Sequence, residues 1–184
     1  MKKLFLTGLL LFCTSVFAQQ APKPPANVGE VMDRQFSGLE REFVPLVEAM
    51  PADKFDFAPT SGEFKGVRTF ALQAKHVATV NYMVAAALLA EKPPVDTKSE
   101  NGADNLKTKD QIVKYVKDSF VYAHKAIVTV NDKNAIEMID GPFGSKASRL
   151  SLAAIMTWHS FDHYGQMVVY LRMNGLVPPA TRQQ

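Results

Sequence analysis

The chain has 184 residues, of which 47% are hydrophobic and 21% are charged, and its formal net charge is +3. This length and composition predict a globular protein with one domain and a sizeable core. The small net charge excludes a strongly basic protein that binds nucleic acid by electrostatic attraction, so no nucleic-acid partner is expected.

Residues 1–18 have the pattern of a secretory signal peptide. A basic Met-Lys-Lys start precedes the apolar run "LFLTGLLLF", and Val16 and Ala18 provide small side chains before the expected cleavage point. The run is too short for a membrane span, so no membrane association is expected after cleavage. Cleavage would remove two lysines and the only cysteine, Cys13, which leaves no disulfide and no thiol nucleophile. We therefore expect an exported protein in a compartment such as the periplasm.

The segment after the signal predicts a tether and a first helix. Residues 19–27 form a proline-rich tether that cannot be helical. A helix is expected over 28–49, with Asn27 as its N-cap and Pro51 beyond its end. The connection over 51–68 carries three phenylalanines, and we expect it to pack against the body of the protein.

The second and third helices are separated by a polar loop. The second is expected over 69–90, before "KPP" at 92–94, and it is apolar nearly all round, as a buried helix is. Its apolar surface also makes a homodimer an expectation. The third begins at the capping box "TKDQ", which starts at Thr108, and continues to about residue 130.

The last part of the chain predicts an irregular segment over 131–147 and a fourth helix over 148–174. Gly175 has the position of its C-terminal cap. Four long helices, with no segment of period-two alternation and no internal repeat, predict an all-α four-helix bundle formed by one domain over 28–184.

Two histidines lie one turn apart on the fourth helix, in the stretch "WHSFDHYGQ". Because His159 and His163 share a stripe with apolar residues, both rings are expected to point into the core. The members of that stripe follow one another at steps of three or four: Leu152, Ile155, His159, His163, Gln166, Tyr170 and Met173. A buried, unpaired imidazole costs about 1–3 kcal/mol, so a partner is required.

A similar inward stripe on the second helix contains His76. If the second and fourth helices are neighbours, three neutral imidazoles converge and can hold one divalent metal ion, with Zn, Ni and Fe(II) all compatible with nitrogen ligands. The alternative is a structural bundle in which the histidines are hydrogen-bonded to each other and to Gln166. His124, on the third helix, is expected to be a structural or rim residue.

The whole chain after the signal resembles the DinB-like superfamily, the damage-inducible metal-binding family and not the DNA polymerase that shares its name. The resemblance rests on "KHVATVNYM", on "HSFDHYGQMVVYLRMNGLVPP" and on the connection "MPADKFDFAPTSGEFKGVRTFALQAKH". It implies a DinB-like four-helix bundle in which His76, His159 and His163 bind a divalent metal. His124 has no counterpart in that motif.

The resemblance and the site chemistry together suggest a metal-dependent hydrolase that acts on an unknown small molecule. A non-catalytic metal or ligand binder is the alternative, and a closed site would favour it. A thiol-dependent transferase is a third reading, which the expected export disfavours because low-molecular-weight thiols are cytosolic. Gln166 and Tyr170 lie on the ligand face and could orient water or substrate, or simply pack. Asp162 is a candidate general base by sequence, but its angle around the helix favours a carboxylate that flanks or supports the ligands.

Overall fold

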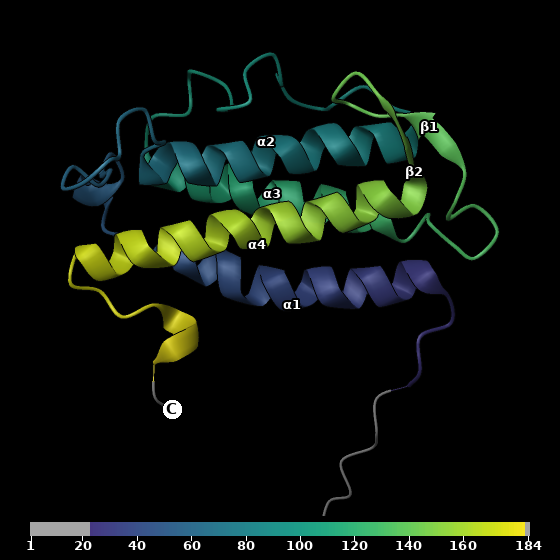
Figure 1. The fold of residues 1–184 in the computed structure, drawn as a ribbon, viewed down its shortest axis with the longest axis horizontal. Helices are drawn as coiled ribbons and strands as arrows, with labels where there is room; N and C mark the ends of the chain where they lie inside the picture. The colour runs from purple at the N-terminus through teal and green to yellow at the C-terminus, as the bar shows by residue number, and fades with distance from the viewer. Residues whose placement is uncertain (1–22, 183–184) are drawn as a thin grey trace, which may run out of the picture.

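A computed structural model describes residues 23–182 of the chain and shows a bundle of four long helices (Figure 1). The predicted signal peptide over 1–18 lies outside the described residues. The helices are α1 (Val28–Ala49), α2 (Phe70–Leu89), α3 (Lys109–Ile127) and α4 (Arg149–Met173). Helices α1 and α2 each pack against both α3 and α4. The prediction of an all-α bundle is therefore confirmed, and α2 and α4 are neighbours.

The helix termini are fixed by the side chains that the sequence places there. The Asn27 side chain accepts a hydrogen bond from the Glu30 N–H at 3.0 Å, as an N-cap does. Thr108 and Gln111 form the predicted capping box at the start of α3. After α4, Gly175 has a φ of 73°, and the N–H groups of Gly175 and Leu176 donate back to the last turn of the helix.

The connection between α1 and α2 packs against the bundle, as expected. It contains the short helix η1 (Ala52–Lys54), and Phe55, which follows η1, is buried against Phe70. The carbonyl groups of Phe55 and Phe57 accept from the first N–H groups of α2, at 2.8 and 2.9 Å. Phe64 does not follow the expectation that all three phenylalanines pack against the bundle, since its side chain is exposed.

Residues 131–147 are not wholly irregular, which corrects the prediction. Strands β1 (Met138–Asp140) and β2 (Lys146–Ser148) pair as an antiparallel hairpin with Ile139 opposite Ala147. Three residues are too few to show period-two alternation in a sequence, so the strands had no detectable signal. The hairpin lies beside the end of α2 and leads directly into α4 (Figure 1).

Helix α2 is the most deeply buried helix of the bundle. The connection from α2 to α3 adds Val95 and Leu106 to the packing around the core, so less of the apolar surface of α2 is left for a second copy than the sequence suggests. Several large apolar side chains of α4 are exposed instead: Trp158, Phe161, Val169 and Met173. Among residues 23–182, no helix combines the length and hydropathy that crossing a bilayer requires.

We predict opposite effects of alanine at two glycines of α1. A Cβ atom at Gly29 would lie 1.9 Å from the backbone oxygen of Val130, whereas at Gly38 the nearest atom, on Arg41, is 3.8 Å away. Gly29→Ala should lower the free energy of unfolding by about 1–3 kcal/mol because the backbone must move. Gly38→Ala should raise it by about 0.5–1 kcal/mol because alanine favours the helix.

Urea denaturation of the two variants and the wild type measures this difference. Gly38→Ala is the matched control, because it makes the same chemical change within the same helix. A Gly29→Ala protein as stable as the Gly38→Ala protein would contradict the close approach of α1 to Val130.

Candidate metal centre

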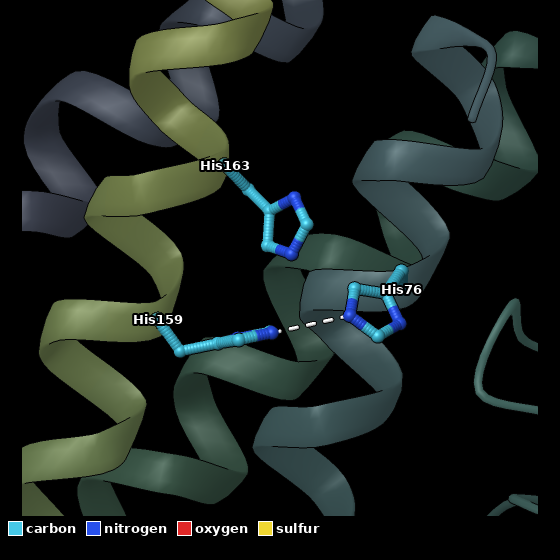
Figure 2. Close-up of side chains that lie close together, drawn as sticks. All are labelled: His76, His159 and His163. Carbon is cyan, nitrogen blue, oxygen red and sulfur yellow. Dashed lines mark hydrogen bonds between the residues drawn. The ribbon is translucent and has the colours of Figure 1, made fainter. Parts of the chain in front are cut away.

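Three histidines converge between α2 and α4 (Figure 2). His76 comes from α2, and His159 and His163 come from successive turns of α4. One ligand nitrogen of each ring lies within 4.8 Å of those of the other two. The ring centroids are 4.6–5.0 Å apart, and the Nε2 atoms of His76 and His159 are 3.1 Å apart. The structure therefore brings together the three residues that the sequence singled out.

The three rings meet because α2 and α4 pack side by side. The two helices run antiparallel, so the first turns of α2 face the second half of α4 (Figure 1). His76 and His163 are 6% and 7% exposed, and His159 is half-buried. Rings on one helical face are thus placed within reach of a ring on the neighbouring helix without any distortion of either backbone.

Two of the rings have hydrogen-bond partners that fix their tautomers. His76 Nδ1 donates to the backbone oxygen of Glu100 at 2.9 Å, and His163 Nδ1 donates to the Gln73 side-chain oxygen. A proton on Nδ1 leaves the lone pair on Nε2, the form in which histidine binds a metal. His159 Nδ1 is buried and has no hydrogen-bond partner among residues 23–182.

Burial keeps the three imidazoles neutral. It lowers the pKa of His159 to about 4 and of His163 to about 3, and in both cases neighbouring imidazoles lower it further. Burial also lowers the pKa of His76, although the hydrogen bond to Glu100 partly opposes this. All three rings therefore carry free lone pairs at neutral pH, as metal ligands must.

The arrangement fits a divalent cation. His76 uses its Nδ1 proton on Glu100, so its Nε2 atom can only accept, and it faces Nε2 of His159 at 3.1 Å. The His163 tautomer likewise leaves Nε2 as an acceptor. The hydrogen bond between the Nε2 atoms of His76 and His159 is donated by His159 Nε2–H, and a cation bound by the three Nε2 atoms would take the place of that proton. An imidazole set of this kind suits Zn, Ni or Fe(II).

A cleft of about 550 Å³ opens beside His163. Its polar lining includes the side chains of Arg68, Asn101, Asp162 and Gln166. Arg68 donates from Nε to the Asn101 side-chain oxygen at 2.7 Å, and its guanidinium lies 3.7 Å from the Glu100 carboxylate. Of the three rings in the cluster, that of His163 lines this cleft.

Sequence reasoning missed two elements that hold the cluster in place. One is Gln73, which lies three residues before His76 on the same face of α2 and whose polarity in an apolar helix was a detectable signal. The other is the turn Ser99–Gly102, which supplies the backbone acceptor for His76. Gly102 has a φ of 76° and approaches Lys75 closely, so glycine is required there. A backbone acceptor has no signature in a sequence.

The remaining candidate residues take different positions. Gln166 lies next to the cluster and contacts Gln73. Tyr170 is buried, donates to the backbone oxygen of Arg68 at 3.1 Å and packs edge-on against Phe57, so it anchors the connection between α1 and α2. His124 lies between α3 and α1, where its nitrogens contact Asp33 at 2.5 Å and Glu40 at 3.2 Å.

Comparisons with known proteins agree with this architecture. Residues 35–167, more than half of the chain, match the DinB superfamily, and the protein belongs to this family. Its structure is similar to that of a DinB-like protein from Bacillus cereus ATCC 10987, with a TM-score of 0.69 and 15% identity, over 86% of this chain and all of the other.

A DinB-like protein from Bacillus subtilis is also similar, with a TM-score of 0.63 and 16% identity, over 84% of this chain and 99% of the other. At these identities the similarity concerns the fold. A search of curated proteins gave no match.

The lowered pKa values predict how the stability of the metal-free protein depends on pH. In the unfolded chain His159 and His163 titrate near their ordinary pKa of about 6.5, whereas in the folded protein they titrate at about 4 and 3. The unfolded state therefore binds more protons below pH 6.5, and the contribution of the two rings to the free energy of unfolding falls as the pH decreases from 6.5 toward 4.

Urea denaturation between pH 7.5 and 4.5, with a chelator present, measures this dependence. A double variant with His159→Gln and His163→Gln keeps polar side chains but removes both titrating groups, so its stability should fall less steeply. Equal slopes for the variant and the wild type would show that the rings are not buried in their neutral form.

Proposed function

We propose that this protein is a metal-dependent hydrolase that acts on a small molecule and holds one divalent ion with His76, His159 and His163. The observation that carries the proposal is the convergence of the three imidazoles, one of which, His163, lines an open cleft. Three protein ligands leave coordination positions for water or substrate, as catalytic metal sites require.

A divalent ion bound by the three rings supplies Lewis-acid activation of water or of a substrate carbonyl. The protein's own groups supply the orientation. Arg68 has five N–H donors, of which Nε–H is used on Asn101. Its remaining donors, and the side-chain amide of Asn101, are available to bind a carbonyl or an anionic oxygen of a molecule in the cleft. Gln73 and the turn Ser99–Gly102 hold His163 and His76 in the ligating tautomer.

The same geometry favours an enzyme over a non-catalytic metal binder. A purely structural metal site is closed by four protein ligands, whereas His163 borders the cleft. His124 does not join the other three histidines as a ligand, because both of its nitrogens contact carboxylates on α1. The proposal leaves Zn, Ni and Fe(II) as candidates, because each accepts imidazole nitrogen.

The proposal includes export to the periplasm. It is supported by the pattern of residues 1–18, with its basic start, apolar run and small residues before the cleavage point. Export disfavours a transferase that consumes a cytosolic thiol, so hydrolysis, which needs only water as the second reactant, is the reaction that we propose. A homodimer stays a prediction, and the exposed apolar side chains of α4 are the surface to examine first.

Metal content and hydrolysis measured on the same preparations test this function. The mature protein, purified without a histidine tag and incubated with Zn, Ni or Fe(II), should bind about one equivalent, and His159→Ala should bind none. His124→Ala is the matched control, because it removes a histidine of the same bundle from outside the cluster and should keep the metal. The single tryptophan, Trp158, lies 6.2 Å from the His159 ring and reports binding by fluorescence.

The metal-loaded proteins are then assayed against a panel of chromogenic carboxylic esters, amides and phosphate esters. The proposed function predicts hydrolysis of at least one class by the wild type and by His124→Ala, with loss in His159→Ala. Metal binding without any hydrolysis would favour the non-catalytic binder. Failure of the folded wild type to bind any of the three ions would contradict both functions.

A further inference from the structure

We propose that Asp162 is a positioning residue, which fixes the tautomer of the buried ring of His163 from the protein surface. It acts through two side-chain amides, those of Gln166 and Gln73. We refer to these three residues, Asp162, Gln166 and Gln73, as the amide chain. The inference deepens the proposed function, because the ring in question is one of the three proposed metal ligands.

The amide chain is continuous from the surface to the cluster. Gln166 Nε2 donates to Asp162 Oδ2 at 3.0 Å, and Gln73 Nε2 donates to Gln166 Oε1 at 2.9 Å. The oxygen of Gln73 then accepts from His163 Nδ1. Asp162 and Gln166 are exposed, whereas Gln73 and His163 are 2% and 7% exposed. Three hydrogen bonds thus connect a solvated carboxylate to a buried imidazole.

The direction of every hydrogen bond follows from the carboxylate. An ionised Asp162 can only accept, so Gln166 must present its NH₂ group to it and its oxygen to Gln73. Gln73 must then present its own NH₂ group to Gln166 and its oxygen to His163. The only ring atom that can satisfy that oxygen is a protonated Nδ1, and the lone pair of His163 is left on Nε2. A single acceptor at the surface therefore determines the tautomer of the buried ring.

The need for such a determinant is specific to His163. His76 donates to the backbone oxygen of Glu100, which cannot exchange places with a donor. The partner of His163 is a side-chain amide, whose oxygen and nitrogen can exchange by a rotation of about 180° with little change of shape. Rotation of both amides would turn an NH₂ group toward Nδ1 and move the ring proton to Nε2, the atom that must bind the metal. The charge of Asp162 opposes this rotation, because a rotated Gln166 would direct its oxygen at the carboxylate.

The test is the tautomer of His163 in the metal-free protein, measured by the ¹⁵N chemical shifts of its ring. In the wild type, Nδ1 should be protonated and Nε2 should not. Asp162→Asn can accept or donate, so the preference of the amide chain should be lost, and His163 should become a mixture of both tautomers. The ring of His76 provides an internal control, since its backbone acceptor is unchanged and its signals should stay where they are.

A second substitution should restore the tautomer without restoring the original carboxylate. In the double variant with Asp162→Asn and Gln166→Glu, the new carboxylate accepts from Gln73 directly, and the asparagine can donate to it. His163 should return to the Nδ1-protonated form. Asp162→Glu, the conservative variant, should also keep this form, because it keeps an acceptor at the end of the amide chain.

Metal affinity gives an independent readout. Outer partners of metal ligands typically account for about 10- to 100-fold in affinity, so Asp162→Asn should weaken the binding of Zn by about tenfold and the double variant should recover it. Because Asp162 and Gln166 are exposed, all of these variants should unfold at the wild-type temperature. A wild-type tautomer in Asp162→Asn, or an equal change in His76 and His163, would overturn the inference. The tautomer measurement needs no metal, so its failure is distinguishable from a failure of the proposed function.

Discussion

The strongest physical demand in this bundle comes from three uncharged imidazole rings that lie largely buried between α2 and α4. Each ring brings a donor and an acceptor into the space between the two helices, and each buried polar atom left unpaired there costs about 1–3 kcal/mol. Hydrogen bonds to oxygen satisfy only part of these polar atoms. The structure supplies oxygen acceptors for Nδ1 of His76 and of His163, but directs the opposite side of those rings toward one another and toward His159. The acceptors that remain are of the kind that a cation binds.

The groups that satisfy the rings come from parts of the chain far apart in sequence. Glu100 belongs to a turn in the connection between α2 and α3, and Gln73 and Gln166 come from facing positions on two helices. Arg68 connects these parts, since its side chain contacts Asn101 and its backbone oxygen accepts from Tyr170 on α4. The loops around the cluster are therefore held to the helices that carry the ligands, and the cleft is formed by the same residues.

Much of this could be predicted from the sequence, and the reasons are local. Helix bounds depend on caps such as Asn27, Thr108 and Gly175, whose effect is confined to one turn. The inward direction of His159 and His163 followed from their spacing among apolar residues. The contact of these rings with His76 could be predicted only on the condition that α2 and α4 are neighbours. Periodicity within a helix does not show which helices pack together, and only the structure shows that α2 packs against α4. The hairpin and the Glu100 carbonyl could not be predicted, since short strands and backbone acceptors are specified by tertiary contacts.

In the proposed site, the three imidazoles bind one divalent ion through Nε2. A crystal of the mature protein grown with Zn, with diffraction recorded on both sides of the zinc absorption edge, tests it most directly. One strong anomalous peak is expected, at about 2.0–2.1 Å from Nε2 of His76, His159 and His163 together. A peak elsewhere, or no peak while the three rings contact only one another and protein atoms, would contradict it and leave a bundle with a buried polar cluster.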